Sequence, residues 1–259
     1  MASLDFAKEK EAFKEFYAGN LIVFRDAAES ICTLITLLLA DKEEFPTQQV
    51  LSRVKDRNEC ITKFARKYQS VCEKEKTPYE IKDYITDLIR LRIICHYSSD
   101  VVAVLHVLKQ NFDILEITDK SQAFEMEERL FGYKGLHLDL KLSKNRRELP
   151  EYSRFCNLRF EVQLRTIIQD AWSLLDHKIK YKKNIPHELK LKRRINRLAA
   201  LFELADQEFL NIRKETKLRE DTATAKTSDF QDLTTAEEQQ LTPLDAFAFL
   251  SLAQRKFPD

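Results

Sequence analysis

One stretch in the second half of the chain, residues 158–181, constrains the fold more than any other part of the sequence. Its first residues alternate strictly between apolar and polar side chains, which is the pattern of a β-strand that buries one face. From Thr166 onward the apolar residues recur at three- and four-residue steps, which is typical of an amphipathic helix. The sequence therefore predicts a strand that runs directly into a helix, with Glu161 between Arg159 and Arg165 on the polar side of the strand.

Two further segments, residues 87–95 and 136–142, alternate in the same way and predict two more strands. Together the three strands indicate an α+β fold with a mixed sheet whose one face is covered by helices. Such sheets often leave the other face merely solvated, so the strands alone do not decide between a solvated face and a binding site. If the polar faces coincide, they form one surface from Arg90, Arg92, His137, Lys141, Arg159, Glu161, Gln163 and Arg165.

More charged side chains flank this surface. A short extended segment carries Arg53 and Lys55, the following helix carries Lys63, and Asp87 stands where the strand 87–95 begins. Many cations around one or two carboxylates add little stability when they are exposed. They suit a polyphosphate, because Arg and Lys bind its oxygens while carboxylates hold Mg²⁺.

Three well-known classes of phosphate and metal enzyme are disfavoured by pattern. The sequence has no Gly-x-x-x-x-Gly-Lys-Ser/Thr loop, which excludes a P-loop ATPase. It has no His-Asp dipeptide, which weighs against a metal-dependent HD-type hydrolase. Its five histidines lack the spacing of a zincin.

Composition limits the cellular setting and the partners. A net charge of +1 with 33% charged residues excludes a chain that is basic overall, so a phosphate site must be a local cluster. The five cysteines form no Cys-x-x-Cys pair, which suggests neither a zinc site nor a disulfide framework. The start of the chain has no apolar signal core, and the longest apolar run, residues 31–40, is too short to span a bilayer. These features predict a cytoplasmic protein without a membrane partner.

Two of the three glycines, Gly132 and Gly135, lie just before the strand 136–142. Such a pair is typical either of an ordinary tight turn or of a place where a ligand approaches the backbone.

The apolar periodicity predicts a sequence of helical and sheet regions. Residues 1–45 are expected to form an antiparallel helical pair joined near Gly19 and Asn20. Residues 46–185 would form the sheet domain and residues 186–217 a C-terminal helix packed on it. Residues 218–235 are poor in large apolar side chains and are expected to be a linker. Residues 236–259 would form a short helix, which ends as though cut from a longer chain.

Four blocks of this sequence resemble the RelA/SpoT alarmone synthetase family, and they occur in the family's order between residues 46 and 185. Each block is weak alone, and the four together are specific. They are Arg53-Val-Lys55 with Lys63; Asp87-Leu-Ile-Arg-Leu-Arg92-Ile; Gly132-Tyr133-x-x-x-His137; and Glu161-Val-Gln163-Leu-Arg165-Thr166, followed by Trp172 and Tyr181-Lys182.

The resemblance implies a nucleotidyltransferase-like fold and an enzyme of the GTP diphosphokinase type. Such an enzyme transfers the β,γ-diphosphate of ATP, with Mg²⁺, to the 3′-hydroxyl of GDP or GTP, and it makes (p)ppGpp and AMP. The absence of a recognisable hydrolase domain and of a long regulatory half places the likeness with the small, synthetase-only branch.

The resemblance also implies roles for residues at the matching positions. Arg53 and Arg92 would flank the adenine, a stacking role that suits planar guanidinium groups. Lys55 and Lys63 would bind the ATP phosphates. Asp87 would be a ligand of Mg²⁺.

The remaining roles belong to catalysis and to the acceptor. Glu161 would bind the metal or take the proton of the 3′-hydroxyl, with Gln163 in support. Tyr133 would stack on the acceptor base, and His137, with Lys134 nearby, would contact the acceptor's phosphate or ribose.

Three departures from the family pattern leave the acceptor open. The family usually has glycine or another small residue in place of Arg90, and serine in place of Glu59 and Gly135. Adenine nucleotides or the 3′ end of tRNA are therefore alternative acceptors, and the basic stretches 178–183 and 190–197 could hold an acceptor stem. A catalytically silent regulatory module is a further alternative. The terminal helices could form a homo-oligomer or bind an antitoxin.

Overall fold

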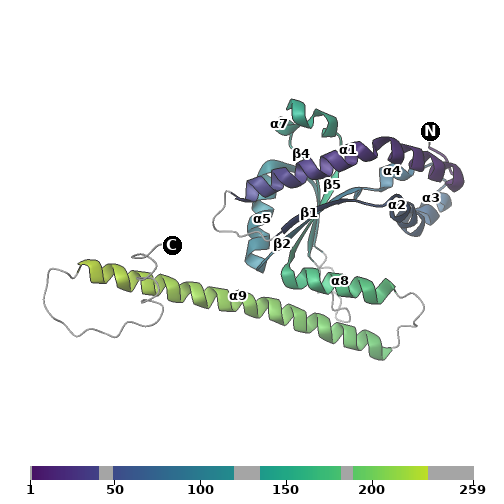
Figure 1. The fold of residues 1–259 in the computed structure, drawn as a ribbon. Coiled ribbons are helices and arrows are strands. Elements are labelled where there is room, and N and C mark those ends of the chain that lie inside the picture. The colour runs from purple at the N-terminus through teal and green to yellow at the C-terminus, as the bar shows by residue number, and fades with distance from the viewer. Residues whose placement is uncertain (1, 41–48, 120–134, 182–188, 233–259) are drawn as a thin grey trace. The chain divides into compact units, whose positions relative to one another are not determined.

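The computed structural model describes residues 2–40, 49–119, 135–181 and 189–232. Within them a five-stranded sheet has the strand order β1-β2-β5-β4-β3 (Figure 1). The central pair β2–β5 is parallel, and the pairs β1–β2, β4–β5 and β3–β4 are antiparallel. The predicted mixed α+β sheet is confirmed. Its strands are β1 (Gln49–Val54), β2 (Ile89–Cys95), β3 (Phe112–Asp119), β4 (Leu136–Leu142) and β5 (Phe160–Thr166).

Helices α1 (Phe6–Ala40) and α5 (Ser98–Asn111) cover the apolar face of the sheet. Alternation along β2, β4 and β5 brings their apolar side chains to this face, where they are fully buried against both helices. Helix α8 (Ile167–Tyr181) directly follows β5, as the change of period predicts, and lies on the opposite side of the sheet from α1 (Figure 1).

The expectation of a helical pair in residues 1–45 is wrong, because α1 is one helix of 35 residues. Gly19 and Asn20 lie in its interior, and the Asn20 side-chain amide donates to the Phe16 carbonyl at 2.8 Å. A glycine inside a helix costs about 0.5–1 kcal/mol. Burial on both sides of it offsets that cost, since Phe13 packs in a cluster around Phe64 and the second half of α1 packs on the sheet.

Short helices connect β1 to β2. They are α2 (Arg57–Phe64), the π-helix η1 (Ala65–Gln69), α3 (Ser70–Lys74) and α4 (Ile81–Tyr84). Between β4 and β5 the chain forms α7 (Lys144–Arg147) and the 3₁₀-helix η2 (Pro150–Phe155).

The expectation of a linker at residues 218–235 is wrong, because helix α9 (Leu189–Asp232) continues as far as Asp232. The segment is poor in large apolar residues but contains neither glycine nor proline, so nothing in it breaks a helix. The chain forms two compact units, Met1–Asp206 and Gln207–Asp259. In the first unit Trp172 packs with Ala199 and Phe202. The short helix expected at 236–259 lies outside the described residues.

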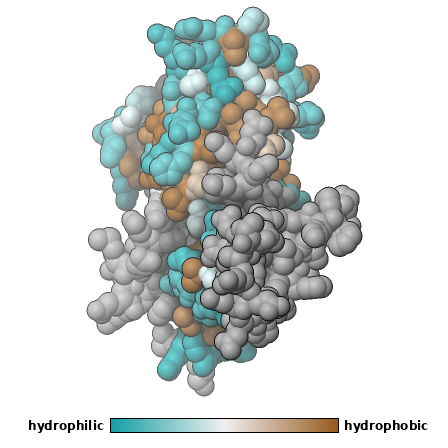
Figure 2. Space-filling model, turned by 90° about the vertical axis from the view of Figure 1, so that its left-hand side faces the viewer, coloured by the Kyte–Doolittle hydropathy of each residue, from teal (hydrophilic) through white to brown (hydrophobic). Residues whose placement is uncertain are grey.

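The described surface is mixed in character. Figure 2 shows hydrophilic side chains with hydrophobic ones interspersed on the face turned to the viewer. Among the described residues, no helix combines the length and the hydropathy that a membrane crossing requires. All five cysteines are free thiols.

Candidate functional site

The polar face of the sheet consists of two rows of side chains that cross all five strands. Strand pairing fixes both rows, because residues opposite one another in register point to the same side. The first row is Arg53, Arg90, Glu161, Asp139 and Glu116; the second is Leu51, Arg92, Gln163, His137 and Thr118.

Asp87 is the point at which three cations meet. The Nζ of Lys55 lies 2.8 Å from Oδ2 and the Nζ of Lys63 lies 2.8 Å from Oδ1. Arg90 brings one terminal nitrogen to 2.6 Å from Oδ2. The Asp87 side chain is only 3% exposed, so its charge is compensated by protein groups rather than by water.

Local structure explains why these groups converge. Lys55 directly follows β1, and its backbone N–H donates to the Leu88 carbonyl at 2.8 Å, which ties it beside the start of β2. Lys63 lies in the last turn of α2, a helix whose N-terminus is capped by the Asp56 carboxylate. These distances bring Lys55, Lys63 and Asp87 together. Their roles toward ATP stay predictions.

Glu161, in the middle of the sheet, is the second carboxylate of the site. Its Oε1 lies 3.1 Å from Arg90 Nε and 3.4 Å from His137 Nδ1, and it accepts a hydrogen bond from the Gln163 amide. Arg90 therefore lies between Asp87 and Glu161 and forms an ion pair with each, but it donates a hydrogen bond only to Asp87, and its buried Nε has no hydrogen-bond partner among the described residues.

The pKa values follow from this arrangement. Burial raises the pKa of Asp87, but hydrogen bonds from Lys55 and Lys63 more than offset it, so the pKa lies well below its ordinary value. Burial also acts to raise the pKa of Glu161, and contacts with His137 and Arg90 lower it to about 2. Burial and the neighbouring Glu161 charge raise the pKa of Asp139. Asp87 and Glu161 are therefore both ionised at neutral pH.

Sequence reasoning missed Asp170, which holds the second arginine of β2. Its Oδ1 lies 3.0 Å from Arg92 and 3.5 Å from Arg165, so the first turn of α8 reaches the polar face. Asp170 stands five residues beyond Arg165, across the change from strand to helix, and no local pattern links it to Arg92. The buried Arg165 Nε lacks a hydrogen-bond partner, and burial lowers the pKa of Arg165.

Arg53 and the departure at Glu59 lie at the exposed edge of the site. Their charged groups approach only to 4.0 Å, and both side chains are about half exposed. Tyr133 and Lys134, the predicted acceptor residues beside His137, lie outside the described residues, so their roles stay predictions.

Gly135, a second departure, has a structural explanation. A Cβ atom there would lie 2.2 Å from the Leu164 carbonyl oxygen and 2.5 Å from the Arg165 Cγ. The backbone before β4 thus approaches β5 so closely that any side chain would force a shift. The sequence suggests either a tight turn or a ligand close to the backbone. At Gly135 the backbone is indeed approached closely, but by the neighbouring strand β5 of the protein itself.

The predicted Mg²⁺ ligands Asp87 and Glu161 are both engaged by protein cations. Both Asp87 oxygens are taken by protein cations, and the guanidinium of Arg90 occupies the space that joins Asp87 to Glu161. In the described part of the chain no cluster of three or more His, Cys, Asp or Glu side chains is arranged to hold a metal. As arranged, these residues do not fit a divalent ion bridged between the two carboxylates.

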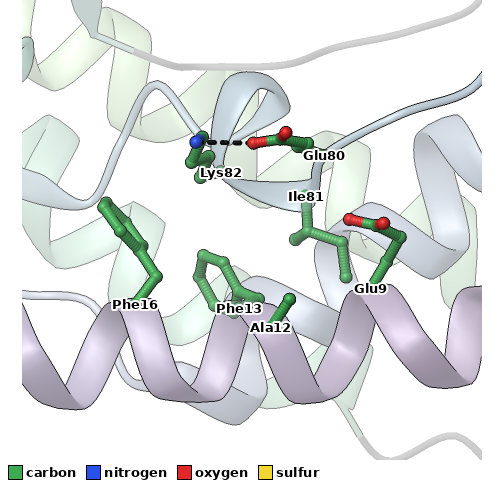
Figure 3. Close-up of a pocket in the computed structure, with 7 residues that line it drawn as sticks. All are labelled: Glu9, Ala12, Phe13, Phe16, Glu80, Ile81 and Lys82. Atoms are coloured by element: carbon green, nitrogen blue, oxygen red, sulfur yellow. Dashed lines mark ion pairs between the residues drawn. The ribbon is translucent and has the colours of Figure 1, made fainter. Parts of the chain in front are cut away.

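A pocket of about 240 Å³ lies apart from these residues, between α1 and α4. Figure 3 shows Phe13 and Phe16 rising from α1 toward the ion pair of Lys82 and Glu80. None of the predicted site residues lines it, so the polar face is the candidate site.

Comparison with known proteins gives the family of this chain. Residues 52–186 match the family model described as the region found in RelA/SpoT proteins. GTP pyrophosphokinase YwaC from Bacillus subtilis is 30% identical over 207 residues, which cover 78% of this chain and 92% of that protein.

Solved structures give the same result. Small alarmone synthetase 2 from Bacillus subtilis is 29% identical with a TM-score of 0.60, and the match covers 77% of this chain and 98% of that one. Small alarmone synthetase 1 from Bacillus subtilis, solved with its product pppGpp, is 24% identical with a TM-score of 0.60 and covers 78% and 98%. The second likeness supports the fold alone.

Proposed function

The chain belongs to the RelA/SpoT family and is a diphosphotransferase enzyme, and we propose that it is a small alarmone synthetase that transfers the β,γ-diphosphate of ATP to the 3′-hydroxyl of GDP or GTP. The observation that carries the proposal is the convergence of Lys55, Lys63 and Arg90 on Asp87 beside Glu161. Three cations face two carboxylates there, so the cluster attracts the oxygens of a polyphosphate.

In this reaction the 3′-oxygen of the acceptor bonds to the β-phosphorus of ATP, the bond from that phosphorus to the α-phosphate oxygen breaks, and AMP leaves. Lys55 and Lys63 exchange their contacts with Asp87 for the β- and γ-phosphate oxygens and balance the charge that grows on the leaving AMP. Arg53 and Arg92 flank the adenine from neighbouring strands.

Glu161 orients the 3′-hydroxyl and accepts its proton, supported by the Gln163 amide. Contacts with His137 and Arg90 lower the pKa of Glu161 and weaken it as a base, so both must loosen for the proton to transfer. Tyr133 and His137 bind the acceptor nucleotide. Mg²⁺ enters with ATP as part of the substrate, and no step depends on an ion held between Asp87 and Glu161.

Transfer of label tests the proposal. Purified protein is incubated with γ-labelled ATP and MgCl₂, with GDP, GTP, ATP or tRNA as separate acceptors. Label on the guanine nucleotide, with AMP formed in equal amount, is the expected result. Transfer of label to ATP or to tRNA instead would show that the acceptor is not a guanine nucleotide. If folded protein transferred label to none of the acceptors, the result would favour the catalytically silent module.

The Tyr133→Ala variant tests the acceptor role within the same assay. Loss of a stacking aromatic is expected to raise the KM for the guanine nucleotide by about tenfold or more, because base stacking contributes about 1–3 kcal/mol. The KM for ATP should stay close to its original value. An effect confined to ATP would contradict the role of Tyr133.

A further inference from the structure

Arg90 occupies the centre of the site, between its two carboxylates. It approaches the Asp87 Oδ2 to 2.6 Å with a terminal nitrogen and the Glu161 Oε1 to 3.1 Å with its Nε. The side chain is 18% exposed, and those of Asp87 and Glu161 are less exposed still. The contact with Asp87 is a hydrogen bond, whereas the contact with Glu161 is an ion pair without one, because the buried Nε of Arg90 has no hydrogen-bond partner among the described residues. The single positive charge of the guanidinium thus lies beside both carboxylates.

A guanidinium and a divalent ion cannot both occupy this position. Mg²⁺ binds carboxylate oxygens at about 2.0–2.1 Å in near-octahedral geometry and keeps several waters around it. The nitrogens of Arg90 already lie against the oxygens that such an ion would have to share. In the nucleotide-free protein the other Asp87 oxygen is held by Lys63.

The charge balance points the same way. The cations Lys55, Lys63 and Arg90 exceed the carboxylates Asp87 and Glu161 by one positive charge before any ion is added. A divalent ion would raise that excess further in a poorly hydrated site, where like charges repel strongly.

We propose that Arg90 takes the place of a divalent ion between Asp87 and Glu161, so that the protein assembles its polyphosphate site with a built-in cation. The proposal deepens the proposed function and rests on it for the identity of the ligand. Two consequences follow. The nucleotide-free protein has no Mn²⁺ site at these carboxylates, and a metal-free nucleoside triphosphate binds without help from a divalent ion.

Binding of Mn²⁺ to the nucleotide-free protein, followed by electron paramagnetic resonance, tests the first consequence without any turnover. The wild-type protein is expected to bind no Mn²⁺ at this position. Arg90→Gly should create a measurable Mn²⁺ site, at least about tenfold tighter than any residual binding by the wild-type protein, because a positive charge beside both ligands is removed. The gain should disappear in Arg90→Gly combined with Glu161→Gln.

Arg92→Gly is the matched control, because it removes an arginine from the same face and strand that pairs with Asp170 instead. It should leave Mn²⁺ binding as weak as in the wild-type protein. A wild-type Mn²⁺ site that is lost in Glu161→Gln and unchanged in Arg90→Gly would overturn the proposal. The measurement on the wild-type protein is informative even if a variant fails to fold.

Calorimetry with α,β-methylene ATP, which cannot undergo the transfer, tests the second consequence. In EDTA the wild-type protein is expected to bind it at least as tightly as in MgCl₂. Arg90→Gly should bind it about tenfold more weakly in EDTA and recover when Mn²⁺ is added. Loss of wild-type binding in EDTA would count against the proposal. Failure of the labelled transfer assay alone would remove the proposed function and leave these binding results intact.

Discussion

The apolar face of the central sheet is buried across its three central strands, whereas the polar face is largely buried at its centre and exposed at its edges, and different forces hold the two. On one face Leu91, Val162 and Leu138 are fully buried against α1 and α5. On the other, Asp87 and Gln163 are 2% and 3% exposed, although both are polar. The apolar face gains stability from area removed from water, whereas the polar face depends on each charge having a partner.

This difference separates what stabilises the protein from what it does. Removing a methyl group from the apolar face leaves a cavity, and the free energy of unfolding falls without changing any charge. Removing one partner on the polar face leaves another charge buried and uncompensated, and it removes a group from the candidate site. The comparison predicts that substitutions on the two faces affect different measurements.

The largest effect is expected for Glu161→Gln on the polar face. The amide keeps the shape and the bond to Gln163 but cannot take a proton or balance Arg90, so turnover should fall by about 10²–10⁴-fold. The circular dichroism spectrum should stay that of the folded protein. The labelled transfer assay measures the change, and turnover equal to that of the wild-type protein would contradict the role of Glu161.

Leu91→Ala on the apolar face should act in the opposite way. Leu91 is fully buried, so its truncation is expected to lower the free energy of unfolding by about 2–5 kcal/mol. Urea denaturation measures this loss. Turnover below the unfolding transition should stay within about a factor of three of the wild-type value, since surviving folded molecules keep the site. A large fall in turnover with unchanged stability would show that the two faces are not separable.

The strands of both faces could be predicted from the sequence because alternation is a local signal. The registers that place Arg90 beside Glu161 follow from three strands each burying one apolar face. The break expected at Gly19 was wrong because packing on both halves of α1 outweighs one residue's propensity. Asp170 and the tight approach at Gly135 depend on contacts between elements, so no spacing along the chain reveals them.

The pH dependence of stability sharpens the same comparison. The pKa of Glu161 is about 2 in the folded protein and 4.5 in the free side chain, so it is depressed by folding. Its contribution is therefore fully present above about pH 5 and is lost as the pH falls toward 2; by linkage it is on the order of 3 kcal/mol. Asp87, whose pKa is also depressed, adds to the loss in acid.

Urea denaturation between pH 7 and pH 2 measures this dependence. Glu161→Gln should flatten the curve, with its deficit largest near neutral pH and vanishing in acid. Leu91→Ala should shift the whole curve downward without changing its slope, because no titrating group is removed. Parallel curves for the wild-type protein and Glu161→Gln would show that the Glu161 charge is not stabilised by folding.

The smallest effect is expected at the exposed edge of the polar face, where Glu59 lies beside Arg53. Its carboxylate and the Arg53 guanidinium are 4.0 Å apart and about half exposed. An ion pair of that kind contributes about 0.2–1 kcal/mol, so Glu59→Ser should barely alter the free energy of unfolding.

The same substitution frees Arg53 for the adenine and removes a negative charge near the ATP phosphates. The KM for ATP should therefore fall by about two- to fivefold at low ionic strength, and the difference should shrink as salt is added. A rise in KM would mean that Glu59 holds Arg53 in the orientation that ATP requires, and the polar face would then extend to its exposed edge.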